Sequence, residues 1–232
     1  MTDHLAADGS TVAGVGGDVV GDLIRDRRVQ YETAGLDVGD VDPDPIVQWQ
    51  RWHADAFEVG MAEPNAMTLG TVDIDGTPDA RIVLVRGADE RGFAFFTNYT
   101  SVKSRQLEAL GAASAVFSWL DLHRQVRVRG RVERLDAESS DAYFASRPRA
   151  SQIGAWASPQ SEVIADRAEL ERLVAAVDRR FAGSDVPRPP HWGGWVLVPG
   201  VFEFWQGRPS RLHDRLRYRR VDAAWQIARL AP

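Results

Sequence analysis

Residues 66–98 read AMTLGTVDIDGTPDARIVLVRGADERGFAFFTN. Residues 66–73, 80–86 and 92–98 of this stretch show the two-residue period and the apolar, β-branched and aromatic content of β-strands. Asp75 and Gly76 supply a turn after the first segment, and an acidic turn follows the second. The stretch therefore predicts a meander of antiparallel strands.

More strand-like segments follow the meander. They are predicted at residues 113–119, 124–134, 194–198, 201–206, 213–219 and 224–229. Helices are predicted between them, at about residues 101–110, 137–146 and 161–181. Many short strands with turn signals favour a barrel, because closure removes the sheet edges that would otherwise pair with other molecules. The expected fold class is mainly β with peripheral α-helices.

Two predicted helices carry apolar faces. Asp44 can cap a helix that starts at Pro45, and His53 on this helix is interpreted as structural. Its apolar face consists of Ile46, Trp49, Ala56 and Phe57. In the helix at residues 161–181, the apolar face, which we interpret as core or interface, consists of Leu170, Leu173, Val174, Val177 and Phe181.

Length and composition indicate a single domain. A chain of 232 residues with 44% hydrophobic residues can build a substantial core, and we expect one domain over residues 25–232. Residues 1–24 have no sustained period and are interpreted as a flexible tail. No apolar run is long enough to cross a bilayer and no signal peptide is recognisable, so a soluble, cytoplasmic protein without membrane contacts is expected.

Composition also excludes several kinds of site. The chain has no cysteine, which removes disulfides, thiolate nucleophiles and thiolate metal sites. Its five histidines include no pair at helical ligand spacing, so no protein metal site is expected. A net charge of −5 and a pI near 5.6 argue against general nucleic-acid binding, which relies on basic surface. The local arginine clusters should therefore bind small anions.

Residues 143–161, YFASRPRASQIGAWASPQS, have the composition of an anion site. Arg147 and Arg149 flank Pro148, which fixes one backbone dihedral and limits where the two guanidinium groups point. Arginine forks and the hydroxyls of tyrosine and serine fit phosphate oxygens. The segment, with a predicted Gly-Ala-Trp turn, is interpreted as a grip for a phosphate ester beside a flat ring.

Residues 201–218, VFEFWQGRPSRLHDRLRY, form a second candidate region. Residues 201–206 alternate like a strand that ends at Gly207. Arg211, His213 and Arg215 then occupy alternate positions, which lie on one face of an extended chain. These groups would repel one another without an anion or a polarisable ring between them, so a ligand is expected here.

Motifs along nearly the whole chain, from about Arg28 to Pro232, resemble the pyridoxine (pyridoxamine) 5′-phosphate oxidase family of FMN-dependent enzymes. The motifs are PNAM (64–67), RIVLVR (81–86), FFTNYTSVK (95–103), RPRASQIGAWASPQS (147–161), PPHWGG (189–194), EFWQG (203–207), RLHDR (211–215) and RLAP (229–232). Their order and spacing carry the resemblance. It implies an FMN-binding split β-barrel that binds its cofactor at the interface of a homodimer.

The resemblance also implies roles for individual residues. Arg81 and Lys103 match phosphate-end contacts of FMN, and the further FMN contacts it implies are Ile82, Val83, Leu84, Val85, Arg86, Phe96, Thr97, Gln125, Gln160, Ser161, Trp205 and Arg215. The substrate contacts it implies are Arg86, Tyr143, Arg147 and Ser151 at a phosphate, Arg211 and His213 beside a pyridine ring, and Arg28 and Tyr31 closing over the substrate. Arg211 and His213 are the expected catalytic residues.

The implied reaction oxidises pyridoxamine or pyridoxine 5′-phosphate to pyridoxal 5′-phosphate. A hydride passes from substrate C4′ to flavin N5, and O₂ reoxidises the flavin with formation of peroxide. Because no nucleophile is needed, orientation and electrostatics should supply most of the catalysis. Two alternatives remain open: a flavin oxidase acting on another ring, such as a phenazine-type substrate, and a non-catalytic protein that binds FMN or pyridoxal phosphate.

Two residues depart from the family pattern. Arg86 stands where the family commonly has lysine, which keeps the charge and changes its reach. Val102 stands where an arginine often meets the FMN phosphate. We therefore expect somewhat weaker or more salt-sensitive FMN binding unless Arg105 or another group compensates.

Overall fold

The computed structural model describes residues 31 and 33–232. Its strands are β1 (Ala66–Val72), β2 (Pro78–Leu84), β3 (Gly87–Asp89), β4 (Gly92–Asn98), β5 (Ala112–Trp119), β6 (Arg124–Arg134), β7 (Trp192–Gln206), β8 (Asp214–Val221) and β9 (Ala224–Leu230). Its α-helices are α2 (Pro45–Glu58), α3 (Val102–Leu110), α4 (Ala137–Ser146), α5 (Arg149–Ala157) and α6 (Arg167–Arg180). Three short 3₁₀ helices, η1 (Val38–Asp40), η2 (Leu120–Leu122) and η3 (Pro209–Arg211), complete the described part. The mainly β fold with peripheral helices is confirmed.

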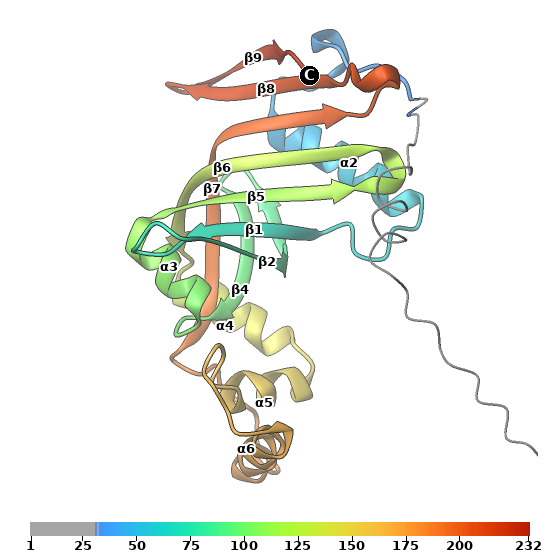
Figure 1. Cartoon of the computed structure of the whole chain (residues 1–232). Coiled ribbons are helices and arrows are strands. Elements are labelled where there is room, and N and C mark those ends of the chain that lie inside the picture. Colours follow the sequence, from blue (N-terminus) through green and yellow to red (C-terminus); the bar gives the residue numbers. More distant parts are fainter. Residues whose placement is uncertain (1–30, 32) are drawn as a thin grey trace, which may run out of the picture.

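The described strands form one antiparallel sheet in the order β2-β1-β5-β6-β7-β4-β3, and β8 and β9 extend it from β7. The long strand β7 pairs with β4 through residues 192–197 and with β8 through residues 201–206. Between these halves the pairing with β6 shifts at Arg129 and Gly130. The sheet therefore curves into a half-barrel, and β7 runs from the end near α5 to the opposite end beneath β8 (Figure 1).

The separate strands predicted at residues 194–198 and 201–206 are thus one strand. Pro199 and Gly200, which indicate a turn in the sequence, lie within β7 at the shift in register. Gly130 on β6 makes this close approach possible, because a Cβ there would lie 1.9 Å from the carbonyl oxygen of Val198.

Helix α2 closes one side of the core. Asp44 caps it by accepting a hydrogen bond from the amide of Ile46, as predicted. Trp49 and Trp52 are buried, and Trp49 packs edge-on against Phe93 and Phe117 of the sheet. The prediction for Phe57 was wrong: it is 71% exposed, because it points away from the face formed by Ile46, Trp49 and Ala56.

The Gly-Ala-Trp turn was also a wrong prediction, because those residues belong to α5. Pro148 precedes the helix, and the side chain of Arg149 donates hydrogen bonds to the carbonyls of Phe181 and Ser184. Arg149 therefore ties α5 to the end of α6 and is not part of an anion grip.

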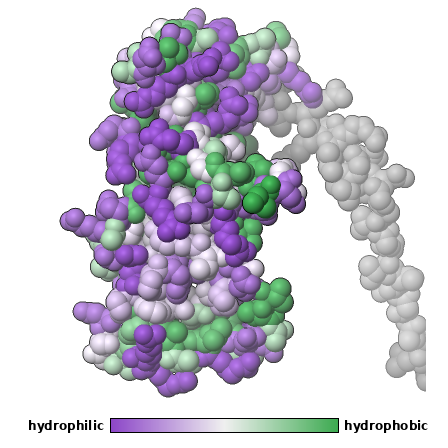
Figure 2. Space-filling view, turned by 90° about the vertical axis from the view of Figure 1, so that its left-hand side faces the viewer, coloured by the Kyte–Doolittle hydropathy of each residue, from purple (hydrophilic) through white to green (hydrophobic). Residues whose placement is uncertain are grey.

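Helix α6 begins at Arg167, later than predicted, with Asp166 as its cap. None of its residues is fully buried, although Phe181 just beyond it is. Ile153, Leu170 and Val174 line a groove between α5 and α6. Apolar atoms gather at this end of the molecule (Figure 2).

The predicted shared face of Arg211, His213 and Arg215 is not formed. Arg211 lies in η3 with a φ of 60°, and β8 begins only at Asp214. The extended geometry that would align the three residues is therefore absent, and only Arg215 belongs to a strand.

Across residues 31 and 33–232, no helix is long and apolar enough to span a bilayer. The same residues contain no group of three or more His, Asp or Glu side chains suited to holding a metal ion.

Candidate active site

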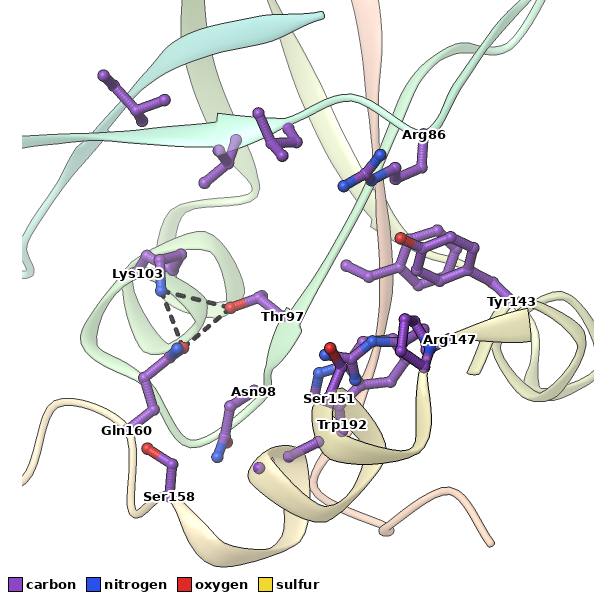
Figure 3. Close-up of a pocket in the computed structure, with 17 residues that line it drawn as sticks. Arg86, Thr97, Asn98, Lys103, Tyr143, Arg147, Ser151, Ser158, Gln160 and Trp192 are labelled. Carbon is purple, nitrogen blue, oxygen red and sulfur yellow. Dashed lines mark hydrogen bonds between the residues drawn. The ribbon is translucent and has the colours of Figure 1, made fainter. Parts of the chain in front are cut away.

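A cavity of about 600 Å³ opens between the sheet and helices α4 and α5. Its lining comes from β2, Arg86 between β2 and β3, β4, the start of α3, the segment from α4 to Gln160, and the first residue of β7. Figure 3 shows Lys103, Thr97 and Gln160 on one side and Arg86, Tyr143, Arg147 and Ser151 on the other. The cavity thus has two polar sides, each with at least one cation.

Lys103 holds the first side. Its Nζ donates to Gln160 Oε1 at 3.0 Å and to Thr97 Oγ1 at 3.3 Å. Burial lowers the pKa of Lys103, and the positive charge of Arg81 lowers this pKa further. A dianion placed here would reverse that shift, and the first turn of α3, whose Ser101 makes no side-chain cap, adds a favourable dipole.

Arg86 and Arg147 hold the second side. Arg147 Nη1 is buried and has no hydrogen-bond partner among the described residues. Burial lowers the pKa of Arg147, and the positive charge of Arg86 lowers this pKa further. Arg86 and Arg147 have no ion-pair partner among residues 31 and 33–232, and this pair of cations beside the hydroxyls of Tyr143 and Ser151 is suited to a phosphate or carboxylate.

Three nearly parallel rings wall the cavity beside this second cationic side. The ring centroids of Phe96 and Tyr143 lie 3.9 Å apart at 21°, and those of Phe96 and Trp192 lie 5.6 Å apart at 12°. The guanidinium carbon of Arg147 lies 4.6 Å from the Trp192 ring centroid. The stack fixes Tyr143 and Arg147, and both residues line the cavity.

The structure brings many of the expected site residues together. Those lining the cavity are Ile82, Val83, Leu84, Arg86, Phe96, Thr97, Lys103, Tyr143, Arg147, Ser151 and Gln160. Three others border it without lining it. Arg81 donates to Thr71 and Asp79, Val85 is in the core, and Ser161 Oγ accepts from the amide of Val102 at 3.3 Å.

Some lining residues were not predicted individually. They are Asn98, Pro148, Gly154, Ala155, Ser158 and Trp192. All of them lie inside the motifs FFTNYTSVK, RPRASQIGAWASPQS and PPHWGG. The motifs were therefore the available signal, but their individual side chains could not be oriented without the fold.

The remaining expected residues lie away from this cavity, at the far end of β7 and beyond it. Trp192 at the first position of β7 lines the cavity, whereas Trp205 is near the last position, next to Gln125 on β6 and Arg215 on β8. Arg211 is exposed. Arg28 lies outside the described residues.

Aromatic rings define this second group. The ring of His213 lies 4.6 Å from Trp205, and the ring of Tyr31 lies 4.2 Å from His123 and 5.9 Å from His213. Gly207 leaves space for Tyr31, because a Cβ at Gly207 would lie 2.6 Å from the Tyr31 ring. His123 was not predicted, and nothing in its local sequence indicates that it stacks on Tyr31.

The amide of Arg208 donates to His213 Nδ1 at 3.1 Å. The neutral ring must therefore carry its proton on Nε2. Burial lowers the pKa of His213, and the positive charge of Arg211 lowers this pKa further, which favours the neutral form. His213 can thus donate a hydrogen bond through Nε2.

Comparison with known proteins covers both regions. Residues 54–180 match the family model described as pyridoxamine 5′-phosphate oxidase, and residues 192–232 match the pyridoxine 5′-phosphate oxidase C-terminal dimerisation region. A relative from Burkholderia multivorans, named pyridoxine/pyridoxamine 5′-phosphate oxidase, is 57% identical over 212 residues, which cover 90% of this chain and 99% of the relative. A Burkholderia cenocepacia relative of the same name is 56% identical over the same coverage.

Solved structures agree on the fold. PhzG from Burkholderia lata, in complex with tetrahydrophenazine-1-carboxylic acid, superposes with a TM-score of 0.82 at 31% identity, covering 88% of this chain and 100% of PhzG. A Nostoc punctiforme protein described as pyridoxamine 5′-phosphate oxidase-related and FMN-binding gives a TM-score of 0.64 at 19% identity, covering 79% of this chain and 97% of that protein. The latter likeness concerns the fold alone. With the two family models and the 57% identical relative, the chain belongs to the pyridoxamine 5′-phosphate oxidase family.

Proposed function

We propose that this protein is an FMN-dependent oxidase that converts pyridoxamine or pyridoxine 5′-phosphate to pyridoxal 5′-phosphate. The observation that carries the proposal is a single cavity with two separate cationic sides, one at Lys103 and one at Arg86 and Arg147. A flavin mononucleotide and a phosphorylated substrate each bring a phosphate, so two such sides are needed. The 57% identical relatives named for this activity support the same substrates.

The residues present fit FMN. The cavity volume falls within the roughly 300–1,000 Å³ typical of ligand sites. Lys103, with Arg81 close enough to lower its pKa, would hold the FMN phosphate, and Thr97 and Gln160 would bond polar atoms of the cofactor. Ile82 lines the cavity yet is 69% exposed, which suits cover by a flat ring. When bound, FMN accepts two electrons from the substrate and passes them to O₂, which yields hydrogen peroxide.

The substrate phosphate would be held by Arg86, Tyr143, Arg147 and Ser151. The unpartnered Nη1 of Arg147 supports this role, because phosphate would supply the acceptor that the described residues do not. Binding energy from this remote group would orient the reacting carbon, which is where most of the catalytic advantage should arise.

We further propose that a second copy completes the site. Trp205, His213 and Arg215 are at the far end of β7 from the cavity within one chain, and residues 192–232 match a dimerisation region. In a homodimer, Gln125, Trp205, Arg211, His213 and Arg215 of one subunit would face the cavity of the other. His213 would then donate its Nε2 proton toward the substrate ring. A cytoplasmic location remains a prediction.

The alternative substrate is a ring that carries a carboxylate. The structural likeness to PhzG favours it, since Arg86 and Arg147 suit a carboxylate as well as a phosphate. The higher identity to the relatives named for vitamin B6 esters favours the first proposal.

The test is turnover by the purified, FMN-loaded protein in air. We expect aldehyde and peroxide with pyridoxine 5′-phosphate, and aldehyde, peroxide and ammonia with pyridoxamine 5′-phosphate, because water hydrolyses the imine that oxidation of the amine forms. Unphosphorylated pyridoxamine should show a loss of kcat/KM of at least about a hundredfold. Turnover only of tetrahydrophenazine-1-carboxylic acid would establish the alternative. Binding of FMN or pyridoxal phosphate without turnover of any of these compounds would indicate a carrier.

A further inference from the structure

A single buried carboxylate organises an arginine-rich patch on β6, β7 and β8. Glu203 on β7 lies opposite Arg127 on β6 and opposite Arg217 on β8. Its neighbours Phe202 and Phe204 are fully buried in the core, so the alternation of the strand directs Glu203 to the other face. Only 8% of Glu203 is exposed. Its carboxylate accepts from Arg127 and Arg215, whereas Arg217 Nε is buried without a hydrogen-bond partner among the described residues.

Arg215 is the best-held of these arginines. Its Nε donates to Glu203 Oε1 at 2.9 Å, and its Nη2 lies 2.9 Å from the same oxygen. Its Nη1 donates to the carbonyl oxygen of Ala231 at 2.8 Å. Two acceptors from distant parts of the sequence thus hold opposite sides of one guanidinium group.

The other partner of Glu203 provides an internal comparison. Arg127 Nη1 lies 3.3 Å from Glu203 Oε2, a longer contact made by a more exposed side chain. Removing Arg127 leaves both acceptors of Arg215 in place. Removing Glu203 frees one side of Arg215 and leaves its charge without a counterion.

We propose that Glu203 and Ala231, which follows β9, are positioning residues that hold Arg215 for contact with the flavin of the partner subunit. The inference rests on the proposed function, in which Arg215 is a flavin contact. An arginine that already occupies its binding geometry loses little rotamer entropy when the ligand arrives. The C-terminus of the chain is then part of the cofactor site, although Ala231 itself need not touch the cofactor.

The test is the Kd of FMN for full-length apo protein, measured by quenching of flavin fluorescence. We expect Arg215→Ala to raise Kd by about tenfold or more and Glu203→Ala by about fivefold. Glu203→Gln should stay within about twofold of the unaltered protein, because the amide oxygen still accepts from Arg215. Arg127→Ala is the matched control and should also stay within about twofold, since it removes an ion pair of Glu203 without releasing Arg215.

Deletion of Ala231 and Pro232 provides a second measurement if Glu203→Ala does not fold. Both residues are exposed, and their loss should raise the Kd of FMN by about threefold. The melting temperature should fall less than it would after a substitution in the hydrophobic core. The inference is overturned if Arg215→Ala weakens FMN binding while Glu203→Ala behaves like Arg127→Ala, or while the deletion has no effect. If Arg215→Ala itself leaves Kd unchanged, the flavin role of Arg215 in the proposed function also fails.

Discussion

The cavity and the C-terminal region, by which we mean residues 201–232, use arginine in opposite ways. In the cavity, the side chain of Arg86 has no hydrogen-bond or ion-pair partner within residues 31 and 33–232, and Arg147 Nη1 is buried without one. In the C-terminal region, Arg215 is bound by Glu203 and Ala231, and Arg229 is bound by Asp37 and Asp214. The two cavity arginines therefore suit an external anion, whereas Arg215 and Arg229 have acceptors within the chain. Arg217 is an exception in the C-terminal region, because its Nε is buried without a hydrogen-bond partner among the described residues.

This difference separates ligand binding from positioning. Burying a cation without a partner costs free energy, and that cost is recovered when a phosphate arrives. A cation with internal partners contributes less new binding energy but keeps its geometry. Substitutions in the cavity should consequently change substrate or cofactor affinity directly, while substitutions of the groups that bind Arg215, such as Glu203, should act through the placement of Arg215.

The largest expected effect is the loss of kcat/KM on substitution of Arg147. Arg147→Ala removes the unpartnered donor, and kcat/KM for pyridoxamine 5′-phosphate should fall by about 10²–10³-fold with little change in FMN affinity. Arg149→Ala is the matched control two residues away. It should lower stability by about 1 kcal/mol through loss of the bonds to Phe181 and Ser184, with activity largely retained. Equal losses of kcat/KM in the two variants would remove the distinction between them.

Lys103 should make FMN binding sensitive to alkaline pH. Burial and Arg81 lower the pKa of free Lys103, and a bound phosphate dianion should raise it again. As pH rises through the lowered pKa, the lysine loses its proton in the free protein, so the Kd of FMN should increase by up to about tenfold per pH unit.

The check is a titration of FMN at several pH values above neutrality. Lys103→Arg should abolish the alkaline weakening, because arginine stays protonated there. Lys103→Met should bind weakly at every pH. An alkaline weakening that persists unchanged in Lys103→Arg would assign it to another group.

Sequence predicted most of the sheet because its strands have a strong local period. Residues 124–134 formed β6 with the expected bounds, and residues 66–98 formed strands where they were expected. The meander was a wrong prediction, because β1 pairs with β2 and β4 pairs with β7, so β2 and β4 lie toward opposite ends of the strand order. Prediction from the sequence failed where distant contacts decide the local structure. Pro199 and Gly200 indicate a turn, yet pairing with β6 keeps them inside β7. The segment around Gly154 also indicates a turn, yet it is helical in α5, which the hydrogen bonds of Arg149 hold against the end of α6.

The residues of the candidate site also fall into those that the sequence predicts and those that it does not. The motif residues at Lys103 and Arg147 could be predicted to act on phosphates from their chemistry and from the family resemblance. The sequence does not predict which arginines have partners within the chain. Glu203 and Ala231, which bind Arg215, are an example. Those pairings depend on register between strands and on the path of the C-terminus, which no local pattern encodes.

A smaller effect is expected from Gly207→Ala in the C-terminal region. The new methyl group would lie 2.6 Å from the ring of Tyr31 and would displace that ring from His123 and His213. If Tyr31 closes over the substrate, KM should rise by about fivefold, in line with the cost of overpacking. Gly39→Ala, where a Cβ meets nothing within 4 Å, is the control and should leave KM unchanged. An unaltered KM in Gly207→Ala would exclude a substrate role for the observed position of Tyr31.

The smallest expected effect tests whether the cavity has room for one more cation. Val102 is the first residue of α3, and the nearby Arg105 is already committed to the carbonyl of Thr100 and to Glu162 at 3.4 Å. We therefore do not expect Arg105 to compensate for the missing arginine. Val102→Arg should lower the Kd of FMN by about threefold at low salt, and the gain should shrink as ionic strength rises, because an exposed charge at a helix N-terminus is screened.

Val102→Gln is the matched control for the length of the new side chain, since it adds polar reach without charge. A gain shared by Val102→Gln would mean that contact, not charge, tightens the cofactor. An unchanged Kd in Val102→Arg would mean that Lys103 and Arg81 already neutralise the phosphate. In that case the cavity, like the C-terminal region, would be electrostatically complete once its ligand is bound, and the contrast between the two regions would hold only for the free protein.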